Sequence, residues 1–250
     1  MQKTMTWAIL LVTAMGFTVG CESQTDVGAD AKSLMAESAK LPDAEEVAAA
    51  DPVVVNLQAA RKAMKVGRRD EFEQMKLALE LTGRQKKDFQ AAVDKRAKKL
   101  KKWRETDFYK EYQDTRKELK AARKAGDEDK VARLEKTIEP MGEKNGTFME
   151  SIRAEVLREL TPSQRKGWAG YVLWEKVQGR FRKAKPTDQQ WQEMLKVTTE
   201  VAETLFAKGD ITMIDPYLKS IYALRDDATE KIKETVLTSE QRKVFEPKKK

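Results

Sequence analysis

The sequence offers few side chains that could carry out catalysis or bind a metal ion. It has 250 residues, no histidine and a single cysteine, Cys21. Zinc-type sites and Ser-His or Cys-His nucleophile pairs are built from histidine and cysteine, so both are nearly excluded. Carboxylates alone would have to serve as acid and base, and no dense Asp/Glu loop indicates a site for a hard metal ion. We therefore expect no enzyme activity, no metal site and no cofactor.

The chemistry that the sequence does predict is covalent modification of Cys21. An apolar run from Met5 to Val19 follows Lys3 and ends in Thr18-Val19-Gly20-Cys21. The run is too short for a comfortable membrane span of about 20 residues and is typical of an export signal. Its end resembles a bacterial lipobox, in which the cysteine becomes lipidated and N-terminal, although leucine is usual where Thr18 stands. We predict a lipoprotein signal peptide over residues 1–20; the alternative is an ordinary secretory signal with an incidental cysteine.

Export determines where the protein works and which partners it meets. We expect a lipoprotein of the bacterial cell envelope that faces the periplasm, on the outer or the inner membrane. The net charge of +8 alone would suggest nucleic-acid binding, but export argues against that partner. Residues 21–51 are small, polar and acidic, with eight Asp/Glu against two lysines. Such a segment predicts a flexible tether between the anchor and the folded part.

A strongly basic stretch follows within the folded part of the chain. Residues 95–104, KRAKKLKKWR, hold seven basic residues and no acidic residue. Basic side chains with interleaved apolar groups could bind acidic, unfolded partner chains transiently. Two other interpretations stay open: a solvated helix with Leu100 and Trp103 in the core, and a surface for anionic lipid. The candidate partner-binding residues are Lys95, Arg96, Lys98, Lys99, Lys101, Lys102, Trp103 and Arg104.

A short phrase, Leu-Thr-x-x-Gln, occurs three times, where about 0.05 occurrences would be expected from typical residue frequencies. A fourth, degraded copy has Pro186 in place of leucine. Thr-x-x-Gln is a capping box, in which the threonine and glutamine side chains satisfy the first free N–H groups of a helix. The predicted capping residues are Leu81, Thr82, Gln85, Leu160, Thr161, Gln164, Thr187, Gln190, Leu237, Thr238 and Gln241.

The four copies form two pairs, 81 with 160 and 186 with 237, and each pair brackets a Gly-Asp break. Gly126-Asp127 and Gly209-Asp210 each predict a helix end followed by a new N-cap. Apolar residues recur at helical spacing from residue 52 onward, without sustained strand alternation. We predict an all-α fold of long antiparallel helical hairpins, and we expect Pro140 to kink or split the returning helix.

Paired LTxxQ motifs around a helical hairpin, behind an export signal, resemble the Spy/CpxP family of periplasmic proteins. The resemblance covers roughly residues 81–245 as two tandem units, with proposed boundaries 52–185 and 186–250. It implies an ATP-independent chaperone that binds unfolded or stressed envelope proteins. Family members commonly dimerise into a cradle; here two units in one chain predict a monomer that mimics that dimer. The alternative function is a structural or signalling envelope lipoprotein that binds one specific partner.

Overall fold

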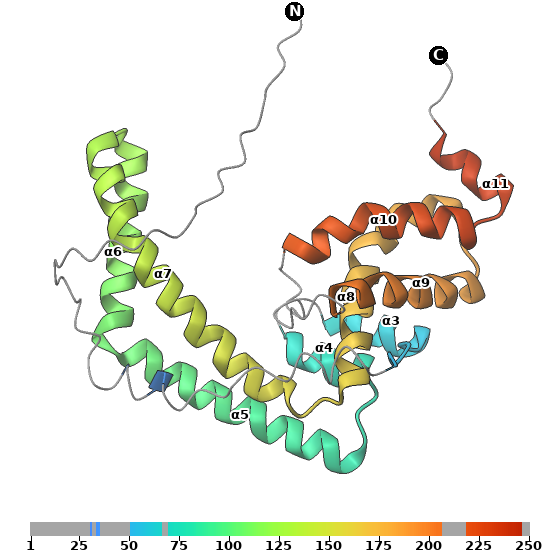
Figure 1. The fold of residues 1–250 in the computed structure, drawn as a ribbon, viewed down its shortest axis with the longest axis horizontal. Helices are drawn as coiled ribbons and strands as arrows, with labels where there is room; N and C mark the ends of the chain where they lie inside the picture. Colours follow the sequence, from blue (N-terminus) through green and yellow to red (C-terminus); the bar gives the residue numbers. More distant parts are fainter. Residues whose placement is uncertain (1–30, 32–33, 36–50, 67–69, 207–218, 247–250) are drawn as a thin grey trace, which may run out of the picture.

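The computed structural model describes residues 31, 34–35, 51–66, 70–206 and 219–246, and every regular element in these ranges is a helix (Figure 1). The prediction of an all-α fold is confirmed. The elements are α3 (Leu57–Val66), α4 (Glu71–Ala78), α5 (Gly83–Glu105), α6 (Asp107–Ala125), α7 (Glu128–Leu157), α8 (Pro162–Phe181), η1 (Arg182–Ala184), α9 (Asp188–Phe206), α10 (Lys219–Thr235), α11 (Ser239–Arg242) and η3 (Lys243–Phe245). The predicted signal peptide, Cys21, most of the predicted tether and Gly209-Asp210 lie outside the described residues.

Helices α5, α6 and α7, residues 83–157, form an arm that extends away from the other helices (Figure 1). The predicted turn at Gly126-Asp127 is confirmed. Gly126 ends α6 with a left-handed φ of 74°, a conformation that glycine adopts at little cost. The Asp127 side chain then accepts from the Lys130 N–H at 3.0 Å and caps α7. The arm is therefore an antiparallel hairpin with its tip at this turn.

The outgoing side of the arm is divided at Thr106, which the apolar spacing alone did not predict. Thr106 has an extended conformation, φ −65° and ψ 148°, so α5 ends there. Its hydroxyl accepts from the Tyr109 N–H at 3.2 Å and caps α6. The returning α7, in contrast, continues through Pro140 for 30 residues, so the expected split does not occur. Proline removes one backbone hydrogen bond, and the packing of Met141 and Phe148, both C-terminal to Pro140, in an apolar cluster supports the helix.

The arm has an apolar cluster of its own where α5 and α6 meet the middle of α7. We name it the corner cluster; its arm residues are Leu100, Trp103, Phe108, Tyr109, Tyr112, Met141, Phe148, Met149 and Ile152. Trp103 stacks on Phe148, with ring centroids 4.1 Å apart, and its indole N–H donates to Asn145 Oδ1 at 3.1 Å. This cluster holds the bend at Thr106 against α7.

Three described residues of the predicted tether also belong to this cluster. Ala31 and Leu34 are buried against it, and Met35 packs on it half-buried. At these three residues the chain packs on the arm, whereas the sequence predicted a flexible tether over residues 21–51. Their apolar side chains share one face of a helical turn and find an apolar surface on the arm.

The body comprises α3, α4, α8, α9 and α10, with α8 in contact with α4, α9 and α10 (Figure 1). Trp168 and Tyr171 of α8 are fully buried and stack with ring centroids 5.1 Å apart. A Cβ added to Gly170 would lie 2.6 Å from the Cα of Thr199, so glycine permits the close approach of α8 and α9. Residues of both proposed units thus share one core.

Candidate functional site

The first pair of LTxxQ motifs meets at the base of the arm through a reciprocal pair of glutamine amides. Gln85 Nε2 donates to Gln164 Oε1 at 2.6 Å, and Gln164 Nε2 donates back to Gln85 Oε1 at 3.1 Å. Gln85 Nε2 also donates to the carbonyl of Glu159 at 3.2 Å. These bonds connect the start of α5 to the start of α8, 79 residues later, and close the arm at its base.

The second pair of motifs repeats this arrangement. Gln190 Nε2 donates to Gln241 Oε1 at 2.6 Å, and Gln241 Nε2 donates back to Gln190 Oε1 at 3.0 Å. Gln190 Nε2 also donates to the carbonyl of Val236 at 3.0 Å. Glu159 and Val236 occupy the same place in their motifs, directly before Leu160 and Leu237. The same hydrogen bonds therefore connect α9 to α11.

Three of the four predicted caps form, and one does not. The hydroxyls of Thr161, Thr187 and Thr238 each accept from the N–H of the motif glutamine at 3.2–3.3 Å. In each case the glutamine Oε1 accepts in turn from the threonine N–H. The predicted cap at Thr82 is wrong, since its side chain makes no capping hydrogen bond. The other features of the motif are kept at this copy: the Lys86 N–H donates to the Thr82 carbonyl, and the Gln85 amide donates across the hairpin.

The apolar positions of the motifs lie in the main core of the protein. Leu160 and Leu237 are buried, and Leu81 is half-buried against the same core. The aromatic residue that follows each motif also packs there: Phe89 and Trp168 are fully buried, and Phe245 contacts Phe181 with centroids 5.6 Å apart. The repeated phrase thus supplies a core anchor, in most copies a helix cap, and a cross-hairpin hydrogen bond.

The basic stretch of α5 is divided between solvent and the interior of the arm. Five of its basic side chains are exposed: Lys95, Lys98, Lys101, Lys102 and Arg104. Among them, Lys95 also pairs with Glu155, with Nζ 3.6 Å from Oε2. The five side chains form a row of cations along the outside of the arm. Helix α5 as a whole holds ten basic and three acidic residues, so this side of the arm is strongly positive.

Three of the predicted partner-binding residues face inward, and their assignment to an exposed surface is wrong. Trp103 is fully buried in the corner cluster because its apolar ring follows the inward helical stripe. Lys99 is buried with Glu155, with Nζ 2.5 Å from Oε1. Arg96 lies half-buried over the ring of Phe72, 4.8 Å from its centroid. Burial lowers the pKa of Arg96, and the positive charge of Arg104 lowers it further.

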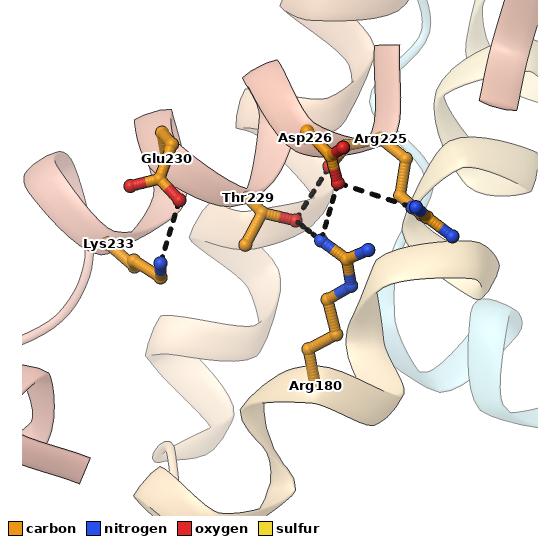
Figure 2. Close-up of polar contacts among 6 residues, drawn as sticks. All are labelled: Arg180, Arg225, Asp226, Thr229, Glu230 and Lys233. Carbon is orange, nitrogen blue, oxygen red and sulfur yellow. Dashed lines mark hydrogen bonds and ion pairs between the residues drawn. The ribbon is translucent and has the colours of Figure 1, made fainter. Parts of the chain in front are cut away.

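A polar network between α8 and α10 was not predicted from the sequence (Figure 2). Arg180 on α8 donates to Asp226 Oδ1 at 2.8 Å and to Thr229 Oγ1 at 3.0 Å on α10. The hydrogen bond from Arg180 lowers the pKa of Asp226, and Arg225 adds to the effect. Lys233 and Glu230 form a separate pair along α10, with Lys233 Nζ 2.7 Å from Glu230 Oε1. The network depends on how two helices that are distant in sequence pack together, so no local motif indicates it.

Neither a cluster of metal ligands nor a membrane-spanning helix is present among the described residues. In the ranges given above, no three carboxylate or cysteine side chains gather as metal ligands. Among those same residues, no helix combines the length and the apolar character needed to cross a bilayer. No protein-family model matches the chain, and comparison with curated proteins and with solved structures finds no match.

Proposed function

We propose that this protein is an exported, lipid-anchored, ATP-independent chaperone that binds unfolded or stressed envelope proteins. The proposal draws on the resemblance of its paired LTxxQ motifs to those of Spy/CpxP proteins and on the lipobox-like sequence at Cys21. It also draws on the arm, which presents a long helical surface away from the body (Figure 1).

The observation that carries the proposal is the row of exposed cations on α5. Lys98, Lys101 and Lys102 are exposed without an acidic partner within 4 Å among the described residues. Unpaired surface cations attract acidic chain segments over distances near the Debye length, about 8–10 Å at moderate salt. They raise the rate of encounter more than the final affinity, which suits a protein that captures many partners and releases them.

A second function is favoured by one feature near the tip of the arm. A pocket of about 460 Å³ lies between α6 and α7, with Leu119 and Ile138 among its lining residues and Arg116, Lys117, Lys120 and Arg123 around them. One defined basic pocket with an apolar floor fits a single acidic partner better than a range of unfolded chains. This feature supports the alternative of a structural or signalling lipoprotein with one specific envelope partner.

The two functions differ in an aggregation assay. The purified protein is mixed with several unrelated unfolding proteins of different net charge, and light scattering is recorded at low and high salt. Suppression of aggregation for most of them, strongest for acidic proteins and weaker at high salt, supports the chaperone. No suppression, together with saturable capture of one envelope protein, would support the alternative.

The anchor is tested separately. Changing Cys21→Ser should move the protein from the membrane fraction to the soluble periplasmic fraction, because the acyl chains are lost. Mass spectrometry of the wild-type protein should show the added lipid. If the wild type carries no lipid and both forms fractionate alike, the anchor is excluded.

A further inference from the structure

We infer that the corner cluster is a docking surface for a short amphipathic helix, and that Ala31, Leu34 and Met35 of the same chain are its resident occupant. We name these three residues the docked segment. The contact itself is part of the structure: Ala31 is 1% exposed and Leu34 is 8% exposed, and both pack in one cluster with Trp103 and Phe148. The inference is that this contact covers an apolar surface that other helices can occupy.

The spacing of the docked segment defines the kind of ligand that fits. Ala31, Leu34 and Met35 are helical and stand at positions i, i+3 and i+4, which lie on one face of a helix. A small residue followed by two larger ones allows the helix backbone to approach the arm at Ala31. The surface therefore fits an amphipathic helix with this apolar spacing, a common feature of segments exposed when proteins unfold.

The corner cluster depends on the docked segment for cover from outside the arm. Helices α5, α6 and α7 make their principal contacts with one another. All other described members of the cluster belong to the arm, and no described residue of the body takes part. The corner also stands away from α8, α9 and α10 in Figure 1. Loss of the docked segment would therefore expose apolar side chains rather than transfer them to another helix.

The composition of the contact favours exchange between ligands. Met35, Met141 and Met149 all belong to it. Methionine is flexible and polarizable, and it is common on surfaces that accept several partners. The sequence from Val27 to Lys40 carries Asp30 and Glu37 but also Lys32 and Lys40, so its net charge is zero and its attraction to the arm is chiefly apolar. An acidic segment of an unfolded protein that becomes helical on binding would contact the same apolar cluster and, in addition, the exposed cations of α5.

Docking also limits how far the arm can stand from an anchor at Cys21. Ala31 lies ten positions after Cys21, and an extended chain spans at most about 35 Å over that length. Release of the docked segment would move the point of attachment to the start of the body near residue 52, about three times as far along the chain. This consequence rests on the proposed function; the docking contact does not.

The first experiment exposes the surface in the mature protein with Leu34→Asp. Removing one buried leucine should weaken docking roughly 10- to 100-fold, so a dye that fluoresces on apolar surfaces should brighten. The matched control is Val54→Asp, which changes another N-terminal aliphatic residue that is 40% exposed, and it should leave the signal unchanged. An unchanged signal for Leu34→Asp overturns the inference. Loss of helix in the arm, seen by hydrogen exchange, also overturns it, because the segment would then be a permanent part of the core.

The second experiment restores the cover in trans. A synthetic peptide of residues 27–40 should bind the Leu34→Asp protein and reverse the dye signal, and the same peptide carrying Leu34→Asp should bind roughly 10- to 100-fold more weakly. Failure of the wild-type peptide to bind, or equal binding of the two peptides, would overturn the inference. Neither measurement uses a client protein. If both measurements give the expected result but the protein suppresses no aggregation, the docking surface is supported and only the chaperone function is excluded.

Discussion

The arm and the pair α9 and α10, which we name the second hairpin, are closed by the same glutamine hydrogen bonds but differ in what supports their helices. The closing glutamines are 79 residues apart in the arm and 51 residues apart in the second hairpin. In the second hairpin, α9 and α10 lie on α8 and share the main core. The arm extends beyond that core and needs the corner cluster to hold its bend. A fixed closing device can therefore accept helices of different length, provided that the longer pair supplies its own core.

The largest expected loss of stability comes from removing a buried tryptophan, and it should show whether the corner cluster and the main core unfold separately. Trp103→Ala removes the centre of the corner cluster and should cost about 3–5 kcal/mol in the stability of the arm. Trp168→Ala should cost a similar amount in the body, where Trp168 is fully buried. Hydrogen exchange resolved by segment should show early opening of α5, α6 and α7 only in the first variant. Uniform opening of the whole molecule in both variants would mean that arm and body fold as one unit.

The next effect tests whether the two glutamine pairs are one device. Gln85→Met and Gln190→Met keep the side-chain length but leave the facing Nε2 without an acceptor and a backbone carbonyl without a donor. Gln190→Met also removes the acceptor of the Thr187 N–H, so its loss of stability should be the larger of the two. Each should lower the free energy of unfolding by about 1–2 kcal/mol. Gln58→Met, at an exposed position, should change little.

Double variants measure the coupling within each pair. Replacing both Gln85 and Gln164 by Met should cost less than the sum of the single changes, because neither glutamine side chain is then left facing an apolar group. The same should hold for Gln190 and Gln241. A coupling energy near zero in one hairpin and not in the other would contradict this expectation. It would show that two glutamine pairs with the same hydrogen-bond distances stabilise their hairpins to different extents.

The sequence predicts those features that local chemistry determines. The turn at Gly126-Asp127 and three of the four helix caps follow from residues that act on their own neighbours. The pairing of the motifs was also evident, because repetition marks equivalent positions. The Thr106 break has a local signal too, since threonine before Asp107 is typical of an N-cap, but the apolar spacing of residues 89–119 passes through it.

The features that depend on distant segments could not be predicted in this way. Lys99 and Lys98 are neighbours of the same type, and only the arrival of Glu155 from α7 buries one of them. Likewise, nothing near Leu34 indicates that Trp103 will meet it. The acidic composition of residues 21–51 predicted a free tether, because composition reflects how soluble a segment is. It does not show whether another part of the chain offers an apolar surface on which that segment can pack.

A smaller effect compares a cap that forms with one that does not. Thr161→Ala removes the hydroxyl that caps α8 and should cost about 0.5–2 kcal/mol. Thr82→Ala changes the same motif position, yet the Thr82 side chain makes no capping bond, so its cost should be close to zero. Thermal unfolding of the two variants provides the comparison. Equal losses of stability would show that the threonine acts through something other than the cap.

The smallest effect on stability should come from the change with the largest effect on the proposed function. Replacing Lys98, Lys101 and Lys102 by Gln removes three exposed charges from α5 and should change the free energy of unfolding by less than about 0.5 kcal/mol. Lys99→Gln alone, at the neighbouring inward position, should cost about 1–3 kcal/mol, because the buried Glu155 loses its partner at 2.5 Å and keeps Lys95, whose Nζ lies 3.6 Å from Oε2.

Capture of acidic unfolded proteins should respond in the opposite order. The triple variant should capture them more slowly than wild type at low salt, and the two proteins should become alike as salt rises, since the lost attraction is the part that salt screens. The Lys99→Gln variant should keep the salt dependence of the wild type, because its charge does not face solvent. If the triple variant protects acidic and basic clients as well as wild type does at low salt, the outer face of α5 is only a solvated helix surface, and capture must depend on the apolar corner cluster alone.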